Sequence, residues 1–380
     1  MIYLDNAATT EVLPSAKVAA EKAYSEYFLN PSALYKNAEE VRKQLTAARE
    51  TVAGFLHALP EEIYFTSGAT EANNWAVFSG IKNKSLATVA SEGEHACVYE
   101  CIKNLKGKGV NAVFVPLNVD TSVNADRFIE LAGQNCGFAS LIHVSNETGA
   151  INDVGGIFSE IRKRNPGVVL HSDGVQAFGK TETDVKKMNV DLYSVSGHKV
   201  GAPKGVGALY IRKGFCMAPL LYGGGQERGL RSGTENIPGI MAFAAAATAY
   251  AKTYAERMPE LLMMRRRFYK IMQECAGNIN INESSAKNIQ NILSMSVIGL
   301  KSEILQRVLA DESGILIGIG SACAGSKKGN RVLQASGKNQ KEIEGNIRIS
   351  FGIATKAEES NAAAHIIAAK INELRGKIHE

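Results

Sequence analysis

The middle of the chain alternates short apolar runs with longer amphipathic stretches. The apolar runs have the length and the flanking Gly, Asn or Asp residues of buried strands, and they lie at 85–90, 112–117, 140–145, 168–173, 191–196 and 207–212. Helical patterns such as 154–165 fall between them. This alternation predicts an α/β fold with a mostly parallel sheet covered by helices on both faces. Only a Gly-rich loop, too short for a crossover helix, separates the last two runs, so we expect one strand to be antiparallel.

The pattern changes after Ala255. A charged helical segment at 256–273 is followed by strand-like runs at 291–299 and 346–352, with helical patterns between and after them. This order of elements predicts a second, smaller α+β domain. We therefore expect a large domain at 16–255 and a small domain made of 1–15 and 256–380.

Composition excludes several classes of protein. The 380 residues are 45% hydrophobic and 21% charged, as in ordinary soluble globular proteins, and the formal net charge of +5 is small and scattered, so nucleic acid is not an expected partner. The start of the chain lacks the basic and apolar regions of a signal peptide. The most apolar segment, 239–251, is shorter than the roughly 20 residues that a membrane crossing needs. We expect it to be a buried helix in a cytoplasmic protein with no membrane partner.

The cysteines form no disulfide framework and no C-x-x-C pair; they are Cys97, Cys101, Cys136, Cys216, Cys275 and Cys323. Together with the missing export signal, this spread favours reduced thiols. His95, Cys97 and Cys101 lie close enough in the sequence for a metal cluster, but no second pair of ligands lies nearby and their apolar neighbours favour buried structural thiols. The prediction is no metal.

Polar residues cluster at the predicted carboxyl ends of the strands, where open α/β sheets bind their ligands. These sets are Glu94–His95, Asn146–Glu147, Asp173 with Gln176, and Ser196–His198–Lys199. A lysine is almost never fully buried unless it is paired, so Lys199, which lies among small and apolar residues, needs a function. Pyridoxal phosphate requires a lysine for covalent attachment and an acid beside its ring nitrogen, roles that Lys199 and Asp173 can fill.

The phosphate of such a cofactor needs a site of its own. A strand-like run at 63–65 leads into the turn 66–70, and a helix is expected to begin near Glu71. The free amides and the dipole of that helix favour an anion, and Gly68 permits close backbone approach. The turn alone is weak evidence because many helices begin with Ser or Thr as a cap. Together with the Lys199 and Asp173 sets, it favours phosphate binding.

These residues belong to a longer series of motifs that runs through nearly the whole chain. The series is YLDNAATT, NPS, FTSGATEANN, EH, NETGAI, DGVQAFGK, SGHK, PKGVGALYIRKG, GGGQERGLRSGTEN, GSACAG and IRISFG. In it the chain resembles the cysteine desulfurases of the class V pyridoxal-phosphate enzymes, particularly those of iron–sulfur cluster assembly. The resemblance implies a homodimer of the aspartate-aminotransferase-like fold (fold type I). It also implies an enzyme that converts L-cysteine to L-alanine and passes sulfur, as a persulfide, to an iron–sulfur scaffold or another acceptor protein.

The resemblance also assigns site residues. Those implied to be catalytic are Lys199, which binds the cofactor, His95, which stacks on its ring, and Cys323, which carries the sulfur. The residues implied to bind the cofactor are Ala69, Thr70, His95, Asn146, Asp173, Gln176, Ser196, His198, Lys199 and, from the other subunit, Thr234. Those implied to bind the substrate are Arg348, Asn30 and Asn146. Independently, the small residues around Cys323 suit a loop that moves sulfur, and the guanidinium of Arg348 suits a carboxylate.

The motifs differ from the family pattern at a few positions. Tyr35 stands where a histidine is common, Ala38 where a glycine is common, and Gly201–Ala202 where His or Tyr is followed by Gly. These changes affect substrate entry and the choice of acceptor rather than the cofactor. Two alternatives stay open: a selenocysteine lyase or other class V lyase, and a non-catalytic scaffold or regulator with the same fold.

Overall fold

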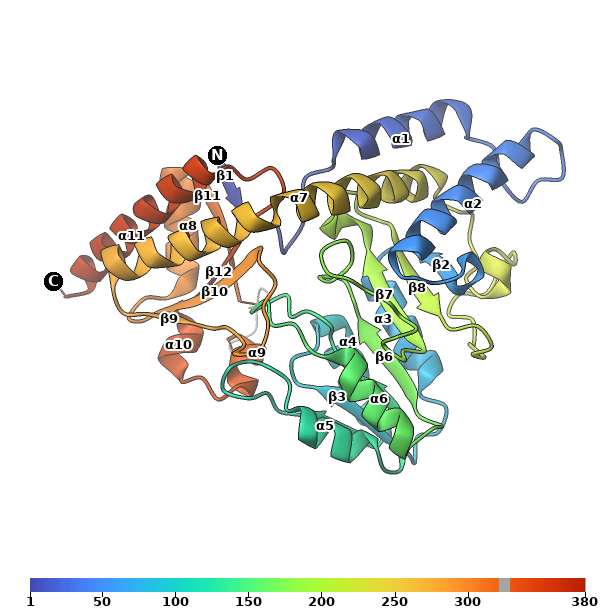
Figure 1. Ribbon diagram of the computed structural model, residues 1–380, viewed down its shortest axis with the longest axis horizontal. Helices are drawn as coiled ribbons and strands as arrows, with labels where there is room; N and C mark the ends of the chain where they lie inside the picture. The colour runs from blue at the N-terminus through green and yellow to red at the C-terminus, as the bar shows by residue number, and fades with distance from the viewer. Residues whose placement is uncertain (321–328, 380) are drawn as a thin grey trace.

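The computed structural model describes residues 1–320 and 329–379, which form two sheets joined by a long helix (Figure 1). The larger sheet has seven strands, in the order β2 (Ile63–Thr66), β8 (Gly207–Ile211), β7 (Leu192–Ser196), β6 (Val169–Asp173), β5 (Cys136–Ser140), β3 (Ala87–Ser91) and β4 (Ala112–Val115). All of its neighbouring strands are parallel except β8, which is antiparallel to both β2 and β7. The predicted mostly parallel α/β sheet with one reversed strand is confirmed.

One predicted strand was placed wrongly. The run 140–145 was expected to be a strand, but β5 ends at Ser140. Beyond that residue the chain still bonds β6, because the Leu141 and His143 amides donate to the carbonyls of His171 and Asp173. The apolar residues at 141–145 are buried, but this segment is not a strand of the sheet. An apolar run in the sequence indicates burial and does not distinguish a buried strand from another buried segment.

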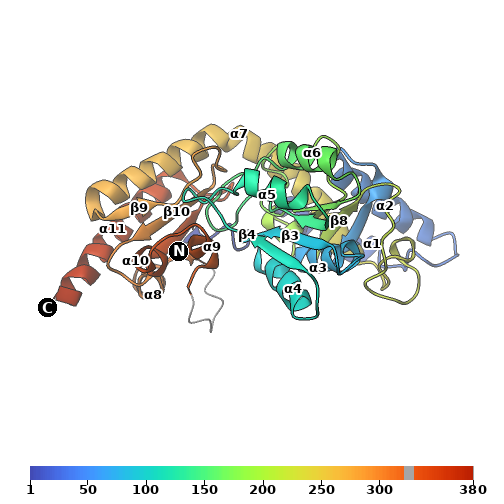
Figure 2. The same cartoon turned by 90° about the horizontal axis from the view of Figure 1, so that it is seen from below.

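Helices cover both faces of this sheet (Figure 2). On one face α3 (Ala69–Gly80) and α4 (Ala96–Lys106) pack against β-strand side chains such as Phe138 and Val169. On the other face lie α5 (Ala125–Ala132), α6 (Val154–Arg164) and the first half of α7 (Ile237–Ala276). Because neighbouring positions of a strand face opposite sides, Val169 and Leu170 contribute to different apolar cores.

The smaller sheet has the order β1 (Ile2–Leu4), β11 (Ile315–Ile319), β12 (Asn346–Ser350), β10 (Ile292–Val297) and β9 (Ile279–Ile281). Strand β1 runs parallel to β11, and the other pairs are antiparallel. Its helices are α8 (Ser302–Ser313), α9 (Arg331–Ala335), α10 (Gln340–Glu344) and α11 (Ala357–His379). The first residues of the chain therefore join the strands of the C-terminal part.

Helix α7 spans 40 residues and passes over both sheets (Figure 1). Its first half packs against α1 (Pro14–Glu26) and α2 (Ala38–Phe55), and its second half against α11. The segments 239–251 and 256–273, both expected to be helical, are parts of this one helix. The change of composition at Ala255 marks a change of surroundings, and Pro259 inside the helix does not end it. The domain limit at 255 thus falls within α7, and the division into 16–255 and the rest stays a prediction.

None of the helices in the described part of the chain combines the length and the apolar character that crossing a membrane requires.

Candidate active site

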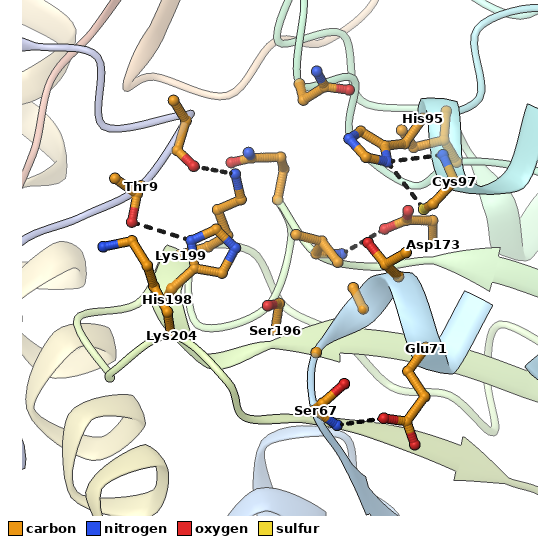
Figure 3. Close-up of a pocket in the computed structure, with 18 of the residues that line it drawn as sticks. Thr9, Ser67, Glu71, His95, Cys97, Asp173, Ser196, His198, Lys199 and Lys204 are labelled. Carbon is orange, nitrogen blue, oxygen red and sulfur yellow. Dashed lines mark hydrogen bonds between the residues drawn. The ribbon is translucent and has the colours of Figure 1, made fainter. Parts of the chain in front are cut away.

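A cavity of about 570 Å³ opens where β6 and β7 end and α3 begins (Figure 3). Nine of the sequence-predicted residues line it, namely Ala69, Thr70, His95, Asn146, Asp173, Gln176, Ser196, His198 and Lys199. They come from segments up to 130 positions apart in the chain, since the carboxyl ends of parallel strands meet at one edge of the sheet. Ala8 and Thr9, from the N-terminal segment, close the side next to Lys199.

Lys199 ends the short 3₁₀ turn Gly197–Lys199 that follows β7. Its Nζ donates to the carbonyls of Ala7 and Ala8, at 2.7 and 2.6 Å. Burial, and then the positive charge of Arg348, lower the pKa of this amine to about 8. An amine that loses its proton near neutral pH can act as a nucleophile or a base.

Asp173, at the end of β6, is buried and held in a fixed orientation. Its carboxylate accepts hydrogen bonds from Asn73 Nδ2 at 2.7 Å and from the Val175 amide at 3.0 Å. Asn73 lies four positions after Ala69, a spacing that places two side chains on one face of a helix. Sequence analysis did not single out Asn73, although this spacing within α3 was a usable signal.

A second carboxyl group, that of Glu94, lies behind the cavity. It is fully buried, and its Oε1 accepts from the Ile142 amide at 2.7 Å. Burial, and then the charge of Asp173, raise the pKa of Glu94 to about 8. Glu94 is therefore mostly protonated at neutral pH, and Asp173 provides the negative charge at this end of the cavity.

His95 caps the N-terminus of α4. Its Nδ1 accepts from the Cys97 amide at 3.3 Å and lies 3.0 Å from Cys97 Sγ. An accepting Nδ1 places the proton of the neutral ring on Nε2. Although the imidazole reaches the open cavity, desolvation by the surrounding protein lowers its pKa. His95 thus presents a neutral ring.

Cys97 was not predicted to line the cavity. Its Sγ accepts from Asn73 Nδ2 at 3.1 Å, and burial together with Asp173 raises the pKa of the thiol far above its ordinary value. Ligand atoms of His95, Cys97 and Asp173 all lie within 4.8 Å of one another, whereas Cys101, the third member of the cluster weighed from the sequence, is buried in an apolar core. The absence of a metal stays a prediction. The described cysteines are unpaired.

The other end of the cavity fits an anion. Gly68 caps α3 with φ +153°, a conformation that favours glycine, and the first amides of the helix have no intrahelical acceptor. A Cβ on Gly207 would lie 2.8 Å from Gly68 Cα, so glycine there lets β8 approach the turn. Ser196 lies beside it, and Lys204, which sequence analysis missed, also lines the cavity. Burial and Lys199 lower the pKa of His198 to about 4, so this ring is neutral.

Arg348 lies in β12, beside the cavity rather than on its lining. Its guanidinium pairs with Asp5 at 2.8 Å and donates to the Asn146 carbonyl at 2.8 Å, while its buried Nε has no hydrogen-bond partner among the described residues. A Cβ on Gly318, opposite Arg348 in β11, would lie 2.6 Å from Asp5 Oδ1, so only glycine leaves room for this pair. Sequence analysis missed Asp5.

Two predicted residues lie apart from the lining of the cavity. Asn30, between α1 and α2, and Thr234, before α7, are both exposed in the single chain. Cys323 lies outside the described residues.

The residues present fit pyridoxal phosphate. The helix N-terminus at Gly68 suits its phosphate, Asp173 suits its ring nitrogen, Gln176 its ring oxygen, and the amine of Lys199 its aldehyde carbon. The fold and this set of residues define an α/β enzyme of fold type I, the aspartate-aminotransferase-like class, which uses this cofactor.

Comparisons with known proteins specify the family. The family model "Aminotransferase class-V" matches residues 2–362, and the chain belongs to that family. It is 34% identical to "Cysteine desulfurase IscS" of Methanosarcina thermophila over 98% of this chain and 93% of that protein. A solved structure named "NIFS-LIKE PROTEIN" superposes with a TM-score of 0.91 at 31% identity, covering 98% of this chain and 99% of the other. Another, "SspA in complex with cysteine", has a TM-score of 0.81 at 30% identity and covers 94% and 100%.

Proposed function

We propose that the protein is a cysteine desulfurase, which converts L-cysteine to L-alanine and leaves the sulfur as a persulfide on Cys323. The observation that carries this proposal is the convergence of Lys199, Asp173 and His95 with the α3 N-terminus in one cavity. The names of the relatives, cysteine desulfurases among them, and the structural neighbour in complex with cysteine support the choice of substrate.

The residues have separate tasks in this reaction. Bound pyridoxal phosphate supplies an electron sink for the substrate carbons. Lys199 attaches the cofactor and, once released, can take and return a proton at Cα, for which a pKa of about 8 is suited. The neutral ring of His95 can hold a proton on Nε2. Arg348 would bind the substrate carboxylate, because a guanidinium can form two parallel hydrogen bonds with it.

Cys323 is proposed from the sequence alone. The Cys323 thiolate attacks the substrate sulfur, and the bond between this sulfur and the substrate carbon breaks. The electron pair of the broken bond stays with the carbon, which gains a proton and becomes the methyl group of alanine. The transferred sulfur is formally oxidised and the carbon reduced, so no outside oxidant or reductant enters. An iron–sulfur cluster scaffold or another acceptor protein then takes the sulfur by thiol exchange.

The predicted homodimer belongs to the same proposal. Thr234 would reach the phosphate bound by the other subunit, and its exposure in the single chain is consistent with that. Large apolar side chains on α1 and the loop after it are also exposed, among them Tyr24, Phe28 and Leu34, which is 99% exposed. A second copy would cover such a surface. Location in the cytoplasm stays a prediction.

Mass spectrometry tests the desulfurase proposal. Purified, cofactor-loaded protein is incubated with L-cysteine and digested without reducing agent. We expect one added sulfur on the peptide that contains Cys323, together with released alanine, and the exposed Cys216 serves as the internal control. Alanine release without sulfur on Cys323 would contradict the proposed carrier, and release of neither product would contradict the proposed reaction.

Mixed dimers test the shared site. A Lys199→Ala chain and a Thr234→Ala chain are each expected to bind the cofactor weakly. In a heterodimer, the Lys199 of the second chain receives an intact threonine from the first, so one site should recover its cofactor affinity. Verified heterodimers without recovery would refute the shared phosphate site.

A further inference from the structure

Lys180 is a buried amine to which the proposed chemistry assigns no role. It lies in the turn after β6, is 8% exposed, and forms no ion pair with a carboxylate of the described residues. Its Nζ lies 3.1 Å from Gln176 Oε1 and 5.9 Å from the centre of the Tyr250 ring. A buried lysine without an anionic partner carries a large desolvation penalty, so its place needs an explanation.

The amine fixes the orientation of the Gln176 amide. Gln176 Nε2 donates to the Ala7 carbonyl at 2.9 Å, and a carbonyl can only accept. On its other side, Oε1 accepts from Lys180 Nζ, which is a donor in its charged form and keeps N–H groups when neutral. A flipped amide would place oxygen against oxygen at Ala7 and N–H against the amine at Lys180. The Ala7 carbonyl therefore selects this orientation, and the charged Lys180 amine, which cannot accept a hydrogen bond, selects the same one.

This orientation determines what Gln176 presents to the cavity. An amide nitrogen carries two N–H groups, and one of them is used by Ala7. Gln176 lines the cavity, so its second N–H is available to a ligand, while its oxygen is turned toward Lys180. A ligand atom beside Gln176 must consequently be an acceptor.

The hydrogen bonds of Gln176 also connect Lys180 to Lys199. The Ala7 carbonyl accepts from both Gln176 Nε2 and Lys199 Nζ, so Lys180, Gln176, Ala7 and Lys199 form one connected series of hydrogen bonds. Burial, and then the charge of Lys199, lower the pKa of Lys180 to about 7. Because both protonation states of the amine retain N–H groups, its hydrogen bond to Gln176 persists on either side of neutral pH.

We propose that Lys180 is a positioning residue, which holds Gln176 so that an N–H points at the ring oxygen of the cofactor. The inference rests on the proposed function, in which Gln176 faces that oxygen. A donor to this oxygen stabilises its anionic form and so lowers the pKa at which the absorption band of the lysine-bound cofactor shifts. With Lys180 removed, only the Ala7 carbonyl of these two neighbours still selects this orientation, so the amide turns its oxygen to the ligand more often and this pKa rises.

Absorption spectra of the cofactor-loaded protein across pH test the proposal in four proteins: wild type, Lys180→Met, Gln176→Ala, and the double variant. We expect each single variant to raise the pKa of the band, by about one unit for Gln176→Ala, since a hydrogen bond to a charged group is lost. If Lys180 acts through Gln176, the double variant titrates like Gln176→Ala alone. Lys180→Gln, a neutral side chain that keeps a donor, should retain more of the wild-type value than Lys180→Met.

Three results would overturn the inference. An unchanged pKa in Lys180→Met shows that the amine does not orient Gln176. Additive shifts in the double variant show that Lys180 acts directly, through its charge. Equal shifts in Lys180→Gln and Lys180→Met also exclude the donor role. A wild-type protein with no lysine-bound band contradicts the proposed function itself, so the two failures are distinguishable. Thermal unfolding identifies a variant that is merely misfolded.

Discussion

Glu94→Gln should change how the stability of the protein depends on pH. The Glu94 carboxyl is fully buried, and its pKa is raised from 4.5 to about 8 by burial and by Asp173. In the unfolded chain the group ionises near its ordinary value. The folded state therefore favours the neutral form. The contribution of the neutral Glu94 carboxyl to the free energy of unfolding is complete below about pH 4.5. It is lost as the pH rises toward 8, because the unfolded chain then releases the proton that the folded protein retains.

The size of the effect follows from the two pKa values. With 1.36 kcal/mol per unit, keeping the carboxyl neutral costs about 1 kcal/mol at pH 5 and about 3 kcal/mol at pH 7. Glutamine is neutral throughout and keeps the Oε1 acceptor for the Ile142 amide. Its N–H₂ replaces Oε2, a buried atom without a partner among the described residues, at a cost of about 1 kcal/mol that does not depend on pH. The ionisation of Glu94 is therefore detected by how the stability difference between Glu94→Gln and wild type changes with pH.

The assay is thermal unfolding of the cofactor-loaded wild type and variant from pH 5 to 8. From pH 5 to pH 7, the melting temperature of Glu94→Gln should gain about 2 to 3 °C relative to wild type. Glu100→Gln, which removes an exposed carboxyl of α4, is the matched control. If the Glu94→Gln difference does not change with pH, the Glu94 carboxyl is not neutral in the folded protein, and the statement that Asp173 provides the negative charge at its end of the cavity is refuted.

Three further substitutions separate the steps of the proposed reaction. Lys199→Ala should lose the absorption band of the lysine-bound cofactor, and a persistent band after dialysis would contradict its role. Cys323→Ser should keep that band and still change its spectrum on adding cysteine, but release alanine at under about 1% of the wild-type rate, since nothing accepts the sulfur; full activity would assign the sulfur to another thiol. Arg348→Lys keeps the charge but loses the planar fork, so steady-state kinetics should show KM for cysteine at least about tenfold higher; an unchanged KM would show that Arg348 does not bind the substrate.

Much of the site was predictable because its residues follow from strand order. Once a parallel sheet is predicted, side chains just beyond the ends of its strands must share one edge, which brought Asp173, Ser196 and Lys199 together before any contact was known. This prediction does not require the exact ends of each strand to be known. The misplaced strand at 140–145 still left Asn146 at the cavity, since the chain continues alongside β6 beyond Ser140.

What the sequence could not provide were the partners that hold these groups in place. Asp173 is oriented by Asn73, 100 positions earlier, and Arg348 by Asp5, 343 positions earlier. Such pairs have no periodicity, because they depend on how separate elements pack. A buried polar atom requires a partner, yet the requirement does not say which segment supplies it. The N-terminal segment, which the sequence analysis used only as a family motif, supplies Asp5 to Arg348 and the Ala7 carbonyl to Lys199. It therefore links Arg348 in the small sheet to Lys199 in the cavity of the large one.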